Sequence, residues 1–286
     1  MIKCKALNKS FENKEKMFEE LRANKDLLIA QKKSESKIKA FELNIFDKSE
    51  GVKQEFKSSD FDLGKSIPCV LNSCMVMDSH DDVSLMNSWK KTANDQNGKI
   101  MHTSDHTISA DKIVAYPRDV ELHLLKTSFK SIGIDSNLET ELLIFNSKLT
   151  SLTNKNILNA YKEGIPLEHS VRLRYINVKM ALNSDHEDDK EEKAIYDKYI
   201  DSILNKDEVN EQGYFYAIYE QALTQEGSTV VNGSNSKTPI LTSNTFEKLR
   251  NSQPLNNTKN GNDQKNEPSN DTLNIDNIAK YLNSKN

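Results

Sequence analysis

The chain has 286 residues, of which 36% are hydrophobic, and a formal net charge of -4. No apolar run approaches the roughly 18 residues that a membrane span needs, and the N-terminus lacks the apolar centre of a signal peptide. Basic residues form no long stripe interleaved with aromatic side chains, so the composition does not favour direct nucleic-acid binding. The apolar residues of the middle are enough for one core of roughly 150–170 residues.

The N-terminal third of the chain predicts one helix followed by strands. Apolar side chains recur at helical spacing from residue 11 to residue 36. We therefore expect residues 1–37 to form an amphipathic helical arm that docks on the body or on another subunit. Alternating residues predict strands at 38–46 and 67–79, and residues 84–95 have the pattern of a short helix.

Strand patterns continue through the middle of the chain. Alternating stretches predict strands at 99–103, 112–117, 120–129 and 139–149. A helix is expected from Asn154, a good N-cap, to Gly164, a good C-terminal stop. The segment after it alternates apolar Val171 and Leu173 with charged Arg172, as a half-buried strand does.

An acidic, helix-like excursion at 186–212 separates that strand from the next one. At least seven strand-like segments with few β-α-β units argue against a doubly wound sheet. The predicted fold class is α+β, a mostly antiparallel β-barrel with peripheral helices, and it occupies residues 38–242. Residues 243–286 are expected to be a tail, disordered over the polar stretch 251–272 and ending in a short helix.

Three side chains that acyl transfer requires lie at the ends of strand-like segments. A serine nucleophile needs a base within hydrogen-bond reach and a third group that orients the base. Ser170 opens a strand after a helix and a turn, His106 ends a strand beside Asp105, and Glu226 ends the last long strand. His102, four residues before His106, remains an alternative base.

The other histidines offer two alternative arrangements. His169 is adjacent to Ser170 and would point to the opposite face of an extended chain, so it is a poor base for that serine. A metal site could use ligand-type side chains from two segments: His80, Asp81, Asp82, His102, Asp105 and His106. Their spacing matches no zinc signature, and we expect neither a metal nor another cofactor.

Five segments between residues 67 and 240 carry a resemblance to a known family. They are MDSHDDV, SLMNSWKKT, SDHTISADKIVAYP, NAYKEGIPLEHSVRLRY and QEGSTVVNGSN, in that order along the chain. Together they resemble the prohead serine proteases of tailed phages, which are similar to the herpesvirus assemblins. Four features depart from the family pattern: Arg172 replaces a small residue after the nucleophile, residues 232–235 replace Pro-Ala-Asn, the Asn-His-Asp order around the base is absent, and the excursion at 186–212 is longer than in compact members.

The resemblance implies a herpesvirus-protease-like barrel and a Ser-His-Glu endopeptidase, with Ser170 as nucleophile, His106 as base and Glu226 as the orienting carboxylate. It also implies scaffold and the major capsid protein as substrates, cleaved inside the assembling prohead in the host cytoplasm during capsid maturation. Self-association is expected, whereas a membrane or a nucleic acid is not expected as a partner.

Two other classes of function stay open on the sequence. A catalytically inactive relative of the same fold would act as a scaffold or capsid-assembly protein through its arm and tail. A metal-dependent hydrolase would use the ligands between His80 and His106.

Overall fold

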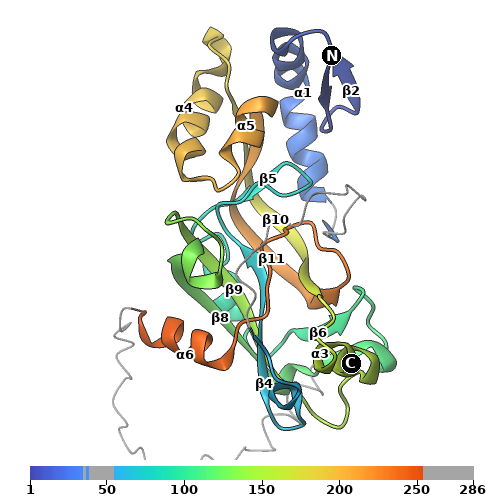
Figure 1. Ribbon diagram of the computed structural model, residues 1–286. Helices are drawn as coiled ribbons and strands as arrows, with labels where there is room; N and C mark the ends of the chain where they lie inside the picture. The colour runs from blue at the N-terminus through green and yellow to red at the C-terminus, as the bar shows by residue number, and fades with distance from the viewer. Residues whose placement is uncertain (35–36, 39–54, 254–286) are drawn as a thin grey trace, which may run out of the picture. The chain divides into compact units, whose positions relative to one another are not determined.

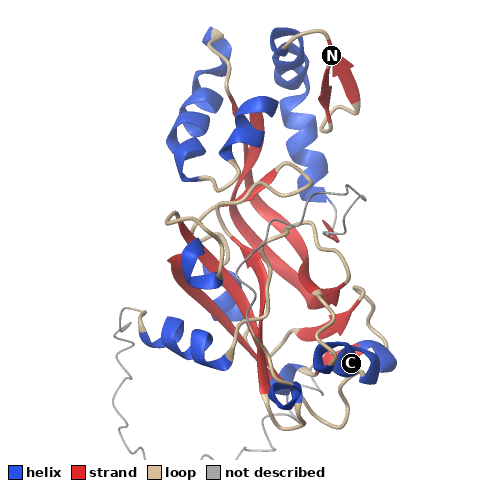
Figure 2. Ribbon diagram, viewed as in Figure 1, coloured by secondary structure: helices blue, strands red, loops and turns tan. Residues whose placement is uncertain are grey.

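The structure, a computed structural model, describes residues 1–34, 37–38 and 55–253. These residues combine helices with three β-sheets in a mixed α+β architecture (Figures 1 and 2). Met1–Gln253 forms one compact unit. Most of the predicted strand at 38–46, the polar stretch beyond residue 253 and the predicted terminal helix lie outside the described residues.

The largest sheet is built around one long hairpin, β10 (Glu168–Leu182) and β11 (Tyr214–Val230). The sheet order is β3-β10-β11-β6-β7, and β5 also pairs with β11. Its shorter strands are β3 (Lys37–Ile38), β5 (Asp82–Ser84), β6 (Met101–Ser104) and β7 (Ile113–Ala115). Because β11 runs antiparallel to β10 but parallel to β5 and β6, this sheet is mixed.

The second sheet is antiparallel throughout, and it packs against the first. It has the order β4 (Ser66–Ser73), β9 (Glu139–Lys148), β8 (Val120–Ser128). The two sheets approach tightly at Gly227 of β11, where a Cβ atom would lie 2.6 Å from Leu71 Cδ1 and 2.8 Å from Phe145 Cε2. A third, two-stranded sheet joins β1 (Ile2–Cys4) to β2 (Lys9–Phe11).

The expected closed, mostly antiparallel barrel is not found among the described strands. They form separate sheets, and the larger one contains two parallel pairings. The prediction counted strand-like segments, and alternation along one segment does not say which neighbour it will pair with. The coarser expectation of an α+β fold is confirmed.

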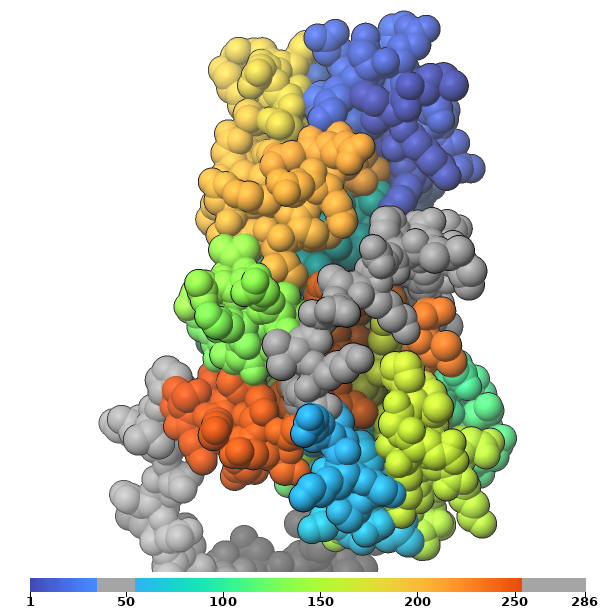
Figure 3. Space-filling view, in the orientation of Figure 1, coloured from blue at the N-terminus to red at the C-terminus, as the bar shows by residue number. Residues whose placement is uncertain are grey.

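The N-terminal helix α1 (Lys14–Ser34) packs on the body of the protein. Its buried side chains Met17, Phe18, Leu21 and Leu28 belong to the same core cluster as the β10–β11 hairpin. Helices α4 (Lys190–Tyr199) and α5 (Lys206–Gln212) form the predicted excursion between β10 and β11. They lie beside the N-terminal residues at one end of the unit (Figure 3).

The remaining helices are short and surround the two sheets: α2 (Lys90–Asp95), α3 (Lys155–Lys162) and α6 (Ser243–Asn251). Asn154 caps α3 by accepting hydrogen bonds from the backbone N–H groups of Asn156 and Ile157. Helix α6 lies beyond the boundary predicted at residue 242, and it buries Phe246 and Leu249. None of the described helices is both long and apolar enough to cross a membrane.

Candidate active site

The β10–β11 hairpin has two faces with different roles. Ser170 pairs with Ser228, and Val171 pairs with Gly227. Gly227 contacts the second sheet, so its neighbours Glu226 and Ser228 point away from that sheet. Cross-strand partners share a face, and Ser170 therefore lies on the same side as Ser228. The candidate site is on this outer face.

A tight turn after β6 carries His106 over the outer face. Asp105 and His106 both have positive φ, of 54° each, and Thr107 N donates to Ser104 O at 3.1 Å. Two central residues of positive φ are the mark of a type I′ turn, in which Asn and Gly are the usual residues. A histidine at the second position is costly, which indicates that the surroundings hold it there.

Three hydrogen bonds from the neighbouring strands hold this turn. The backbone N–H of His106 donates to Ser228 Oγ at 2.9 Å, and Arg172 Nη2 donates to the His106 carbonyl oxygen at 2.7 Å. The backbone N–H of Asp105 donates to the Thr229 carbonyl oxygen at 3.0 Å. The main chain of the His106 turn is thereby held by both strands of the hairpin.

His106 and Glu226 form a buried pair. Their Nδ1 and Oε1 atoms are 2.8 Å apart, and the Glu226 side chain is fully buried. Thr103 Oγ1 donates to the second carboxylate oxygen, Oε2, at 3.0 Å. A carboxylate at Nδ1 favours the tautomer with its proton on that nitrogen, which leaves the lone pair on Nε2. In the described part of the chain, His106 Nε2 is buried with no hydrogen-bond partner.

Ser170 lies one strand away from the residue that binds the His106 backbone. Its Cα is registered opposite Ser228, and only 3% of its surface is exposed. Directly opposed residues of an antiparallel pair have Cβ atoms about 4.5–5.5 Å apart. The structure thus brings two of the three predicted residues into contact and places the third on the adjacent strand of the same face.

His102 and His169 occupy the inner face. His102 Nδ1 lies 2.8 Å from Ser147 Oγ, and its Nε2 lies 2.9 Å from Thr229 Oγ1. His169 Nδ1 donates to the Thr238 carbonyl oxygen at 3.0 Å, and its Nε2 is 3.3 Å from the Tyr161 hydroxyl.

Burial lowers the pKa of both histidines, that of His102 well below its usual range and that of His169 to about 4. Both ring nitrogens of His102 are engaged between the sheets, whereas His106 Nε2 has no hydrogen-bond partner among the described residues.

The side chains suggested for a metal site are used elsewhere. Their hydrogen bonds tie them to separate parts of the protein. Asp82 accepts hydrogen bonds from Tyr175 and Lys32, and Asp81 accepts one from Tyr214 at 2.7 Å. His102 forms a hydrogen bond with Ser147 of the second sheet. Nowhere in residues 1–34, 37–38 and 55–253 do three or more His, Cys, Asp or Glu side chains gather as they would around a metal ion.

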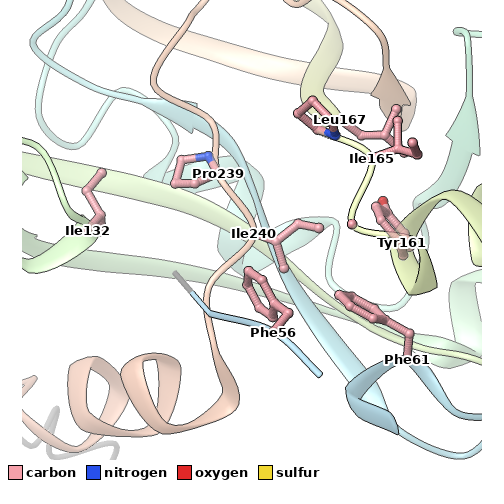
Figure 4. A pocket seen from close by; sticks show the side chains of 10 residues that line it. Phe56, Phe61, Ile132, Tyr161, Ile165, Leu167, Pro239 and Ile240 are labelled. Atoms are coloured by element: carbon pink, nitrogen blue, oxygen red, sulfur yellow. The ribbon is translucent and has the colours of Figure 1, made fainter. Parts of the chain in front are cut away.

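An apolar cavity of about 230 Å³ lies beside the start of β10 (Figure 4). Phe56, Phe61, Tyr161, Leu167 and Ile240 contribute to its wall. Tyr161 also donates to or accepts from Thr229 Oγ1 at 2.7 Å, on the inner face. Among the described residues that line it, the one titratable side chain is Tyr161, and the wall carries no carboxylate, imidazole or amine.

Sequence reasoning missed three residues of the site: Thr103, Ser228 and the side chain of Arg172. Alternation could have indicated Ser228, because Glu226 and Ser228 are two residues apart on one strand. Thr103 is registered opposite Ser228 on β6, and this pairing joins strands that are far apart in sequence. No local pattern indicates the reach of Arg172 to His106.

Comparison of the chain with protein-family profiles, with curated proteins and with solved structures finds no significant match.

Proposed function

We propose that this protein is a serine endopeptidase whose base is His106, whose orienting carboxylate is Glu226 and whose nucleophile is Ser170. The observation that carries the proposal is the buried His106–Glu226 pair, 2.8 Å apart, on the face that carries Ser170. No described residue forms a hydrogen bond with the second ring nitrogen of His106. An oriented imidazole with an available lone pair is what activation of a serine hydroxyl requires.

In the proposed reaction Ser170 Oγ attacks the carbonyl carbon of the scissile peptide, while His106 Nε2 takes the hydroxyl proton. His106 then gives this proton to the leaving amine, and an ester between Ser170 and the acyl group of the substrate remains. Water hydrolyses the ester by the same steps, with His106 again as base. Glu226 stabilises the imidazolium that forms in each half of the reaction.

The biological setting rests on the resemblance to phage prohead proteases. We propose scaffold and the major capsid protein as substrates, cleaved inside the assembling prohead in the host cytoplasm, by an enzyme that associates with itself. The two packed sheets would take the place of the family's herpesvirus-protease-like barrel. Neither a membrane nor a nucleic acid is proposed as a partner.

A second candidate, a catalytically inactive scaffold or capsid-assembly protein, is favoured by one observation. Ser170 is 3% exposed, His106 is 8% exposed and Glu226 is fully buried. A peptide bond must reach the nucleophile before it can be cleaved, and burial of this degree suits a structural polar cluster as well as a closed enzyme.

Labelling with a fluorophosphonate probe separates these functions without knowledge of the substrate, because the probe reacts with an activated serine hydroxyl. We expect the label on Ser170 in the wild type, its loss in Ser170→Ala and His106→Ala, and no change in Ser151→Ala, a surface control. Chelator should not affect the labelling. An unlabelled wild-type protein would favour the assembly protein, and casein cleavage abolished by chelator would favour a metal-dependent hydrolase.

The phage role needs a separate measurement. The chain would be co-expressed with a candidate major capsid protein of a tailed phage, and the capsid protein's N-terminus would be sequenced. We expect a truncated N-terminus with the wild type and an intact one with Ser170→Ala. Labelling of Ser170 without capsid cleavage would support the proposed peptidase activity and contradict the proposed role in the prohead.

A further inference from the structure

One cation reaches into the buried pair of the candidate site. Arg172 lies on β10, two residues after Ser170, where the partner on β11 changes from Gly227 to Leu223 across a bulge. Its Nη2 donates to the His106 carbonyl oxygen at 2.7 Å, and its Nε lies 3.3 Å from Glu226 Oε1. The Nε atom makes no hydrogen bond of good geometry, so its contact with the carboxylate is mainly one of charge.

The charges of the site balance only when Arg172 is counted. A carboxylate without solvent contact is costly unless a positive charge compensates it. A base must be neutral before it can accept a proton, so His106 cannot supply that charge in the resting state. Arginine stays charged at every pH at which the protein is folded, and it is the group that can keep Glu226 ionised while His106 is neutral.

The same side chain also fixes the conformation of the base. His106 has a positive φ, which costs free energy, and its carbonyl oxygen accepts from the guanidinium. One planar group therefore contacts both the main chain of the base and the carboxylate that orients its ring. This arrangement couples the position of the imidazole to the position of Glu226.

We infer that Arg172 is a positioning residue of the proposed Ser170 site, where it keeps His106 neutral beside an ionised Glu226 and holds the His106 turn. The inference rests on the proposed function. Glu226 on β11 contacts the imidazole, and the adjacent Asp105 in the turn pairs with the exposed Lys112 at 3.5 Å. Arg172 is the cation that faces the pair from β10.

Removal of the guanidinium should favour the imidazolium, because Arg172 is the one permanently charged cation that contacts the buried carboxylate in the described part of the chain. In Arg172→Met we expect the pH of half-maximal Ser170 labelling to rise by about one unit, which corresponds to about tenfold slower labelling on the acid limb. Above pH 9 the labelling rate of Arg172→Met should return to within about threefold of the wild-type rate, since the shift of the midpoint by one pH unit accounts for most of the lost rate.

Two more variants separate charge from shape. Arg172→Lys keeps the charge but loses the planar fork, so we expect a midpoint near that of the wild type with a lower maximal rate. Arg174→Met is the matched control, because Arg174 is exposed two residues further along the same strand. It should leave both the midpoint and the rate unchanged. Urea unfolding of each variant would show which of them remain folded.

The titration of the His106 ring, followed by NMR, tests the inference independently of activity. The ring resonance of Arg172→Met should titrate at higher pH than that of the wild type and of Arg172→Lys. The labelling rate of Arg172→Met could instead be lowered by the same factor at every pH, with an unchanged ring titration. That result would show that Arg172 has only a structural role, and it would leave the peptidase proposal intact. Absence of label on wild-type Ser170 would reject the peptidase itself.

Discussion

At the scale of single residues, the candidate site is a small set of polar side chains on one face of a hairpin. Glu226 receives hydrogen bonds from His106 and Thr103, and Ser228 binds the backbone of His106. Each contact restrains the imidazole ring, so the geometry of the base depends on several neighbours. The catalytic roles of Ser170, His106 and Glu226 remain predictions that substitution can test.

Glu226→Gln should separate the charge of the orienting group from its shape. The amide keeps the size of the side chain but can present its NH₂ group to His106 Nδ1, which would place the lone pair on the wrong nitrogen. We expect labelling of Ser170 to slow by about 10²–10⁴-fold. Glu220→Gln, on the same strand and partly exposed, is the control and should label at the wild-type rate.

At the scale of elements, helix α1 is attached to the excursion between β10 and β11 by ion pairs with buried carboxylates. Arg22 donates to both oxygens of Asp189, at 2.7 and 2.6 Å, and Lys25 Nζ lies 2.7 Å from Glu192 Oε1. Asp189 is 1% exposed and Glu192 is 6% exposed. These pairs join segments that are 167 residues apart in the chain.

Arg22→Met should destabilise the protein strongly, because it leaves the Asp189 carboxylate buried without a cation. Loss of one partner of a buried pair costs about 3–5 kcal/mol in the free energy of unfolding. Lys9→Met is the control, since its pair with Glu20 is exposed and should contribute less than about 1 kcal/mol. Urea denaturation of both variants would measure the difference; equal midpoints would show that the Asp189 pair contributes no more than a surface pair.

The contact between the two sheets can be tested at Gly227. A methyl group there would overlap Leu71 and Phe145, so Gly227→Ala should lower the free energy of unfolding by about 1–3 kcal/mol. The double variant Gly227→Ala, Leu71→Ala makes room for the methyl group and should cost less than the sum of the two single changes. Additive costs would show that the methyl group at position 227 does not clash with Leu71.

At the scale of the whole molecule, the core between the sheets contains two neutral histidines, and it should therefore weaken in acid. The pKa of His169 is about 4 and that of His102 is also lowered, whereas an unfolded histidine titrates near pH 6.5. Between these values the unfolded chain binds more protons than the folded one. The contribution of the two neutral histidines to the free energy of unfolding is thus complete above about pH 6.5 and is lost as the pH falls toward 4.

A comparison of variants isolates this effect, because two buried carboxyl groups act in the opposite direction. Burial raises the pKa of Asp81 and of Glu141, which favours the folded state in acid. His169→Gln should therefore be compared with the wild type by urea denaturation at pH 7.5, 5.5 and 4.5. We expect the variant to lose less stability over this range, by at most about 1.4 kcal/mol per pH unit. Parallel curves would contradict a neutral His169.

Local patterns in the sequence were sufficient for most helices and strands. The helical spacing near the N-terminus, the cap at Asn154 and the alternation around Val171 each depend on residues within one or two turns or pleats. The grouping of His106 with Glu226 came from the order of segments and from the family resemblance, and the structure places these two side chains in contact. These features were accessible because each element, or each motif, can be recognised on its own.

Only the tertiary structure decided how the elements meet. The parallel pairing of β11 with β5 and β6, the separation into two main sheets and the assignment of His102 to the inner face all depend on pairing partners far away in sequence. Arg172 is 54 residues from Glu226, and its reach depends on a bulge in the hairpin. Side-chain alternation specifies two faces of a strand, but which face becomes the core is settled by packing against another sheet.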